Sequence, residues 1–125
     1  MVYIAIIGFG NIGSGVAELL TANSAKVAEA LGETVELKYI CDLNVPQGSP
    51  YAKYFTADFS VIENDPEVRV VVETIGGAGH AYDFTKRSLL KGKSVVTSNK
   101  ELVATHGAEL VSIARDKNAN YLFEA

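Results

Sequence analysis

The fold of this 125-residue chain is decided by its first stretch, Met1-Val-Tyr-Ile-Ala-Ile-Ile-Gly-Phe-Gly-Asn-Ile-Gly-Ser-Gly15. The apolar run Val2–Ile7 predicts a buried strand, and a helical pattern opens directly after it. Between them, Gly8, Gly10 and Gly13 form G-x-G-x-x-G, the dinucleotide-binding pattern, in the strand–turn–helix context that it requires. These glycines allow, in turn, a tight turn, a close approach of the backbone to a pyrophosphate, and close packing of the helix on the strand. An ordinary glycine-rich turn is the alternative.

Composition and charge exclude several classes of protein. The chain is 48% hydrophobic and 21% charged, which is ordinary for one globular domain. A net charge of −4, without a long basic stripe, argues against nucleic-acid binding. No apolar run approaches the roughly 18 residues of a membrane span. Because Cys41 is the only cysteine, no intrachain disulfide can form, which suits a reducing compartment. We therefore expect a cytoplasmic protein with neither a nucleic-acid nor a membrane partner.

Strands alternate with helices along the whole chain. Apolar and β-branched runs predict strands at Val2–Ile7, Val35–Cys41, Arg69–Glu73, Ser94–Thr97 and Tyr121–Phe123. Helical spacing predicts helices over Asn11–Leu31, Asp58–Asn64, Ala81–Lys91 and from a cap at Ser98 to about Lys117. The segment Tyr51–Thr56 fits either a short helix or a short strand. This order predicts an α/β, Rossmann-like, doubly wound and mostly parallel sheet with helices on both faces.

Some helix patterns predict individual positions. The first helix is expected to have one apolar face, made of Ile12, Val16, Leu19, Leu20, Val27 and Leu31. Ser98-Asn-Lys-Glu101 has the pattern of a capping box, with Ser98 as the N-cap. His106 falls on an apolar helix face, which favours a packed or capping histidine. Neither His80 nor His106 has partners at metal-ligand spacing, so no metal site is expected. Cys41 is expected to be a buried small hydrophobic residue.

Candidate binding residues gather at the strand ends, because doubly wound sheets bind ligands outside the carboxyl ends of their strands. These ends are Gly8–Gly13, Cys41–Asp42, Thr74–Gly79, Thr97–Lys100 and Glu124–Ala125. Asp42 stands where a carboxylate can accept hydrogen bonds from both ribose hydroxyls of an adenosine and repel a 2′-phosphate. A turn-forming aspartate is the alternative. The glycines of Thr74–Gly79 fit either a close ligand or a flexible connection.

Lys100 is placed against local preference. A cation in the first turn of a helix opposes the helix dipole and loses about 0.3–1 kcal/mol. A residue that breaks a local rule is a candidate for function. A solvated lysine, whose ammonium reaches away from the helix, is the alternative.

With these residues in place, the chain resembles the amino-terminal domain of homoserine dehydrogenases over nearly its whole length. The matching stretches are Ile6–Val16, Asn64–Val68, Val71–Gly77, Leu90–Gly107 and Tyr121–Ala125. The first of these is shared by many Rossmann proteins. The Ile-Gly-Gly and Thr-Ser-Asn-Lys stretches, in this order, are far more specific.

The resemblance implies an activity and a set of site residues. Homoserine dehydrogenases interconvert aspartate semialdehyde and homoserine with a nicotinamide cofactor, on the route to threonine and methionine. The pyrophosphate is then held by Gly8, Gly10, Asn11, Ile12 and Gly13. The nicotinamide ribose lies near Thr74, Gly76, Thr97, Ser98 and Asn99. Lys100 becomes one of two active-site lysines, whose ammonium can stabilise a developing alkoxide or pass a proton to it.

Two departures from the family pattern bear on the cofactor and on the domains. Members that prefer NADP often carry Arg at the position of Cys41, so the absence of that cation beside Asp42 favours NAD, with NADP as the alternative. Members also continue into a substrate and dimerisation domain. We therefore expect residues 1–125 to be an NAD(P)-binding domain that binds cofactor but has no turnover alone. The small-molecule substrate site and any homodimer contact would lie elsewhere.

Two other functions stay open. The chain also fits the cofactor domain of another small-substrate oxidoreductase, such as an aspartate dehydrogenase, although Thr97-Ser-Asn-Lys100 argues against this. A non-catalytic NAD-sensing module is the second alternative, and it would need no lysine at the nicotinamide end.

Overall fold

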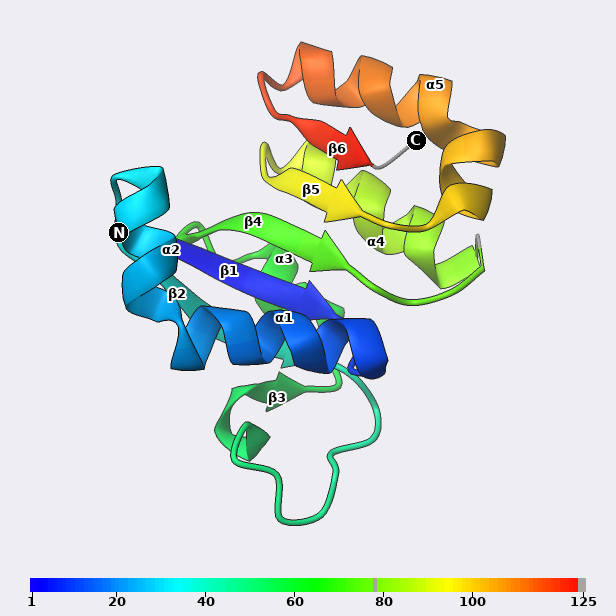
Figure 1. Ribbon diagram of the computed structural model, residues 1–125. Helices are drawn as coiled ribbons and strands as arrows, with labels where there is room; N and C mark the ends of the chain where they lie inside the picture. The colour runs from blue at the N-terminus through cyan, green and yellow to red at the C-terminus, as the bar shows by residue number, and fades with distance from the viewer. Residues whose placement is uncertain (78, 124–125) are drawn as a thin grey trace.

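A six-stranded parallel sheet lies at the centre of the computed structural model, which describes residues 1–77 and 79–123 (Figure 1). The strands lie in the order β3-β2-β1-β4-β5-β6, and each neighbouring pair is parallel. Their bounds are β1 (Val2–Ile7), β2 (Val35–Cys41), β3 (Phe55–Thr56), β4 (Val68–Glu73), β5 (Ser94–Thr97) and β6 (Tyr121–Phe123). This is the strand order of the doubly wound dinucleotide-binding fold. The predicted fold class is confirmed.

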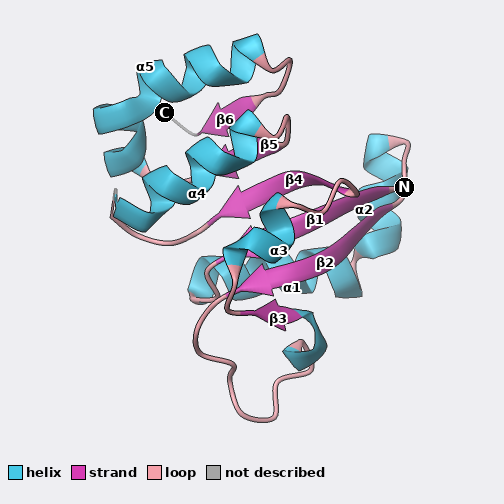
Figure 2. Ribbon diagram, turned by 180° about the vertical axis from the view of Figure 1, so that it is seen from behind, coloured by secondary structure: helices cyan, strands magenta, loops and turns pink. Residues whose placement is uncertain are grey.

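Helices cover both faces of the sheet (Figures 1 and 2). Their bounds are α1 (Asn11–Ala22), α2 (Ser24–Leu31), α3 (Phe59–Glu63), α4 (Gly79–Leu90) and α5 (Lys100–Asp116), with a short 3₁₀ helix, η1 (Ala52–Tyr54). α1 and α2 pack on one face, against β1 and β2, whereas α3, α4 and α5 pack on the other face. None of the helices in the described residues is long and apolar enough to span a membrane.

Strand β1 contributes to two cores, one on each face of the sheet. Ala5 and Ile7 belong to the core beneath α3, α4 and α5. Ile6 belongs to the core beneath α1, together with Ala17 and Leu20. Because successive side chains point to opposite faces, a strand covered on both faces must be apolar throughout. This explains why Val2–Ile7 shows no alternation of apolar and polar residues.

The single helix expected over Asn11–Leu31 is wrong. The backbone leaves helical geometry at Asn23 (φ −117°, ψ 25°), which separates α1 from α2. Asparagine side chains compete for backbone hydrogen bonds and favour such breaks. The expected common apolar face is wrong as well, because Ile12, Leu19 and Leu31 are exposed. The ambiguous segment 51–56 holds both alternatives, η1 followed by β3.

A charged cluster ties β2 to the starts of β4 and β5. Asp65 accepts hydrogen bonds from Lys38 Nζ (2.7 Å) and from the Tyr39 hydroxyl (2.8 Å). Burial alone would raise the pKa of Asp65, but the hydrogen bonds from Lys38 and Tyr39 outweigh it and lower this pKa to about 2. Lys93 is buried, and its Nζ donates to the carbonyl oxygens of Asp65 (2.6 Å) and Val68 (2.8 Å). Three strands are thus joined by charge-assisted hydrogen bonds.

Part of the sheet stays open to solvent. α1 and α2 cover β1 and β2 but leave the same face of β5 and β6 exposed (Figure 1). Val96 and Leu122 on that face are 37% and 57% exposed. With the exposed Ile12 and Phe123 nearby, they form an apolar surface that lines one side of a cavity.

Candidate functional site

The carboxyl ends of β1, β2, β4 and β5 meet along one edge of the sheet. There the chain turns to opposite faces, since β1 leads into α1 on one side and β4 leads toward α4 on the other (Figures 1 and 2). Ligands of doubly wound sheets bind in the crevice at such a reversal. Four of the five predicted strand ends lie at this edge. The fifth, Glu124–Ala125, lies outside the described residues.

The three glycines of the first turn differ in what surrounds them. Gly8 has φ +94°, and a Cβ on it would lie 2.7 Å from Cγ2 of Ile75. A Cβ on Gly13 would collide with the carbonyl oxygen of Gly8, so α1 can pack this close to β1 only with glycine there. A Cβ on Gly10 would meet no atom of the described residues within 4 Å. The fold therefore requires Gly8 and Gly13, whereas Gly10 only keeps outside space open.

The amino end of α1 suits an anion. Gly10 is its N-cap, and no side chain of the described residues forms a capping hydrogen bond there. The first N–H groups of a helix have no partner within the helix. Here they belong to Asn11, Ile12 and Gly13, beside the open space at Gly10. Together with the positive end of the helix dipole, these N–H groups fit a pyrophosphate.

Asp42 joins the glycine turn to the end of β2. Its Oδ2 accepts a hydrogen bond from the Phe9 N–H (2.9 Å), and its Oδ1 accepts one from the Asn44 N–H (3.0 Å). The turn-forming role that was the alternative for Asp42 is therefore present. An ionised carboxylate has about four acceptor positions, so two remain for other donors, such as ribose hydroxyls.

A cavity of about 360 Å³ opens beside Asp42. Leu43, Ile75, His80 and Phe84 are among the residues that line it. The rings of His80 and Phe84 stack with their centroids 5.9 Å apart. The sequence pattern gave no reason to choose these two side chains, because α4 brings them to the end of β2 only in the folded chain. Walls of this kind fit a flat aromatic base.

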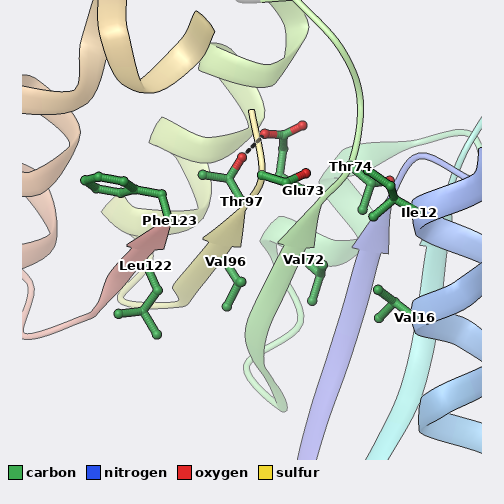
Figure 3. A pocket seen from close by; sticks show the side chains of 10 residues that line it. Ile12, Val16, Val72, Glu73, Thr74, Val96, Thr97, Leu122 and Phe123 are labelled. Atoms are coloured by element: carbon green, nitrogen blue, oxygen red, sulfur yellow. Dashed lines mark hydrogen bonds between the residues drawn. The ribbon is translucent and has the colours of Figure 1, made fainter. Parts of the chain in front are cut away.

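A second cavity, of about 420 Å³, lies on the other side of the β4 end (Figure 3). Ile12, Thr74, Thr97, Ser98 and Phe123 are among the residues that line it, and Figure 3 shows apolar side chains of β4, β5 and β6 along another part. Four of these five residues were predicted from the sequence to bind the cofactor. The exception, Phe123, follows from the position of β6.

Thr74 holds the glycine turn through hydrogen bonds to its backbone. Its Oγ1 donates to the carbonyl oxygen of Ile7 (2.8 Å) and lies 3.1 Å from that of Gly8. The Thr74 N–H also donates to Ile7 (2.9 Å). The end of β4 therefore holds the turn that follows β1.

The N-cap of α5 is Asn99, so the capping box expected at Ser98 is wrong. Asn99 Oδ1 accepts a hydrogen bond from the Leu102 N–H (3.0 Å). The helix begins one residue later than expected, and Ser98 is exposed. The amide of Asn99 is also used, since Nδ2 donates to the carbonyl oxygens of Ile75 (3.2 Å) and Gly77 (2.5 Å). Asn99 thus joins the loop after β5 to the glycine-rich loop after β4.

Lys100 is exposed in the first turn of α5. It follows the Asn99 cap directly, and Gly76, also exposed, lies in the loop to which that cap is bonded. The residues predicted for the nicotinamide side are therefore brought to neighbouring loops at one edge. Lys100 is the only cation among them.

Glu73 is a site residue that the sequence interpretation missed. It ends β4, is 1% exposed, and accepts a hydrogen bond at Oε1 from the Thr97 hydroxyl (2.5 Å), drawn in Figure 3. Its Oε2 has no partner in the described residues. Burial raises the pKa of Glu73, while hydrogen bonding from Thr97, Ile75 and Asn99 opposes the rise. A lone carboxylate at the end of an all-valine run was the available signal.

The described residues contain no group of metal-ligating side chains. His106 is half-buried and packs on the Tyr82 ring, with centroids 4.0 Å apart, which agrees with the packed histidine expected there. Cys41 is buried as expected, and burial raises the pKa of its thiol.

Comparison with known proteins identifies the family. The family model described as "Homoserine dehydrogenase, NAD binding domain" matches residues 8–124. The homoserine dehydrogenase of Corynebacterium glutamicum is 39% identical over 125 residues, which span 98% of this chain and 28% of that protein. The homoserine dehydrogenase of Pseudomonas aeruginosa is 36% identical, with 99% and 29% spanned.

Solved structures agree. A crystal structure of S. aureus homoserine dehydrogenase superposes with a TM-score of 0.89 at 29% identity, covering 99% of this chain and 32% of that one. The structure from Thiobacillus denitrificans gives a TM-score of 0.90 at 29% identity, covering 98% and 29%. The chain spans less than a third of the length of each of these relatives. The strand order, the open glycine turn and the matched sequence lead to one assignment: the chain belongs to the family of homoserine dehydrogenase NAD-binding domains.

Proposed function

We propose that this chain binds the nicotinamide cofactor of a homoserine dehydrogenase, which interconverts L-aspartate 4-semialdehyde and L-homoserine. The open space at Gly10, in front of the uncapped amino end of α1, carries the proposal. The fold supplies a reason for Gly8 and Gly13 but none for Gly10, whereas a bound pyrophosphate does. When bound, the nicotinamide supplies hydride transfer.

The adenosine half of the cofactor is assigned to the β2 side of the edge. Its pyrophosphate rests on the N–H groups of Gly10–Gly13, and its ribose hydroxyls donate to the free acceptor positions of Asp42. The adenine enters the cavity lined by His80 and Phe84. The bonds from Asp42 to Phe9 and Asn44 hold its carboxylate in place before the ribose arrives.

The nicotinamide half is assigned to the β4 and β5 ends. Thr74, Gly76 and the segment Thr97–Asn99 surround its ribose. Lys100 acts on the substrate oxygen: its ammonium stabilises the alkoxide form and exchanges the proton that this oxygen gains or loses. The Asn99 cap fixes the turn of α5 that carries Lys100.

NAD is the preferred cofactor in this proposal. The Asp42 carboxylate attracts ribose hydroxyls but repels a 2′-phosphate, and the neighbouring Cys41 brings no cation to offset that repulsion. NADP binding would then need a cation from the loop that follows, where Lys53 is the nearest in sequence.

The remaining parts of the proposal concern the whole enzyme. Residues 1–125 form the NAD(P)-binding domain. The residues that hold the substrate, and those of a homodimer contact, lie in sequence outside this domain. We place the enzyme in the cytoplasm. The cofactor domain of another small-substrate oxidoreductase, such as an aspartate dehydrogenase, is the second candidate, and the similarity to homoserine dehydrogenases at 39% and 36% identity disfavours it.

Calorimetric titration of the chain with NAD and NADP tests the proposal. Gly10→Val should still fold, because a Cβ there meets no atom of the described residues within 4 Å, yet lose NAD affinity by more than about tenfold. Gly15→Ala is the matched control, since a Cβ there also meets no described atom and Gly15 lies beyond the pattern. Wild-type chain should bind NAD more tightly than NADP. Equal NAD affinity of wild type and Gly10→Val would refute the proposed pyrophosphate site.

A further inference from the structure

One directed chain of hydrogen bonds runs from the start of α5 to the end of β4. The Asn99 N–H donates to Thr97 Oγ1 (2.9 Å), and Thr97 Oγ1 lies 2.5 Å from Glu73 Oε1. The Asn99 N–H can only donate, and the Thr97 hydroxyl has one proton to donate. The Thr97 hydroxyl donates its proton to Glu73 Oε1, so the chain ends on the Glu73 carboxyl group.

The same chain determines where the two loops of the site lie. Asn99 accepts from Leu102 and donates to the carbonyl oxygens of Ile75 and Gly77. Its backbone is fixed by Thr97, and the rotamer of Thr97 is fixed by Glu73. Displacing Thr97 would release the first turn of α5 and the glycine-rich loop together.

Stability alone gives no reason for a carboxyl group at position 73. Burying a carboxyl group costs free energy unless its oxygens are paired. The described residues place no cation beside Glu73, and one of its oxygens has no partner. Figure 3 shows Glu73 and Thr97 on the opposite side of the ribbon from Val72, Val96 and Leu122, away from the apolar floor of the cavity. Glu73 and Thr97 are also among the residues that line this cavity, and the hydrogen bond between them links the group to the loops of the site.

We propose that Glu73 is a positioning residue: through Thr97 and Asn99 it sets the first turn of α5, and with it Lys100, against the glycine-rich loop on the nicotinamide side. The part of this inference that concerns the cofactor rests on the proposed function. The part that concerns loop position does not.

The test uses three variants of the chain, with a fourth as a substitute. Glu73→Leu keeps a similar volume and removes the acceptor, whereas Glu73→Gln keeps an oxygen that Thr97 can donate to. Thr85→Val is the control, because Thr85 Oγ1 is a buried hydroxyl on the same side of the sheet without a partner in the described residues. Thr97→Val removes the hydroxyl in the middle of the hydrogen-bond series from Asn99 to Glu73. It is used in place of Glu73→Leu if that variant fails to fold.

Two measurements distinguish a positioning role of Glu73 from a general loss of structure in the variant. Amide hydrogen exchange reports on the Asn99 and Leu102 N–H groups without any ligand, and it should be about tenfold faster in Glu73→Leu than in wild type. Calorimetry compares NAD with ADP, which lacks the nicotinamide half. Glu73→Leu should lose about tenfold in NAD affinity and keep ADP affinity within about twofold, while Glu73→Gln and Thr85→Val follow wild type for both.

Three outcomes overturn the inference: unchanged exchange at Asn99 and Leu102 in Glu73→Leu, equal losses for NAD and ADP, or Glu73→Gln as damaging as Glu73→Leu. If wild-type chain binds neither NAD nor ADP, the proposed function fails. The exchange measurement then still decides the role of Glu73.

Discussion

At the residue scale, Lys100 differs from the buried Thr97 and Glu73 beside it because it is exposed and sits against the dipole of α5. Lys100→Ala should therefore leave the melting temperature unchanged or raise it slightly, since up to about 1 kcal/mol of unfavourable interaction is removed. In an enzyme that carries this domain together with a substrate domain, turnover should fall about 10²–10⁴-fold, while NAD affinity stays within about twofold.

Steady-state kinetics of homoserine oxidation and calorimetry of NAD binding check this pair of effects. Lys100→Arg is the informative companion, because it keeps the charge but has a guanidinium that does not give up its proton. A turnover near that of wild type in Lys100→Ala would remove Lys100 from the chemistry.

Individual residues were predictable from sequence where one local rule determined them. Gly8 and Gly13 follow from the turn, and the burial of Cys41 follows from its strand. Glu73 did not follow from any local rule, because its acceptor role needs Thr97 from the neighbouring strand. His80 and Phe84 likewise gain their place only when α4 packs beside the end of β2.

At the scale of elements, the link between β2 and the start of β4 depends on the charge of Asp65. Its pKa is lowered to about 2 from the ordinary 3.8, so its contribution is complete above about pH 4 and disappears as the pH falls through 2. The shift corresponds to about 2 kcal/mol. Asp65→Asn can keep an oxygen for the Glu67 N–H, but it removes the charge and puts an amide nitrogen where Oδ2 accepts from Lys38 and Tyr39.

Urea unfolding at several pH values measures this effect. Asp65→Asn should be less stable than wild type by about 2 kcal/mol at pH 7, and the gap should close toward pH 2. The exposed Asp116 provides the control, and Asp116→Asn should change stability by less than about 0.5 kcal/mol. A gap for Asp65→Asn that stays constant with pH would contradict the assignment.

Apart from β3, which was left open, strand positions were predictable to within a residue, whereas the break at Asn23 was not and α4 begins two residues before the expected Ala81. A buried strand can be recognised from the sequence by a short run of apolar residues. The break at Asn23 forms no side-chain capping hydrogen bond, and the cap at Asn99 depends on amide partners that come from another loop. Ile75 and Gly77, which accept from Asn99, lie more than twenty residues away in sequence.

At the scale of the whole molecule, the open face of β5 and β6 predicts self-association. Val96 and Leu122 are exposed together on that side, and apolar surface of this kind drives contact between copies. Sedimentation velocity should show a concentration-dependent rise in mean mass that Leu122→Glu abolishes. Leu90→Glu, an exposed leucine at the end of α4 on the other face, should leave the rise intact. A single monomer at every concentration would count against the prediction.

The whole fold was predictable because the alternation of strands and helices leaves few topologies. The placing of helices on both faces was predicted, whereas the order of the strands was not. Uncovered apolar surface near Tyr121–Phe123 was expected only from the family resemblance, since no residue pattern distinguishes a strand face that meets a helix from one that does not.

The empty space at Gly10 has a consequence for how such a domain changes over generations. Any side chain at Gly8 or Gly13 damages the fold, so these two glycines persist in every descendant that still folds. Only ligand binding requires glycine at position 10. A lineage whose domain no longer binds the ligand could replace Gly10 without a collision at its Cβ. A domain that has lost ligand binding but still folds would thus carry a side chain at position 10 and keep Gly8 and Gly13.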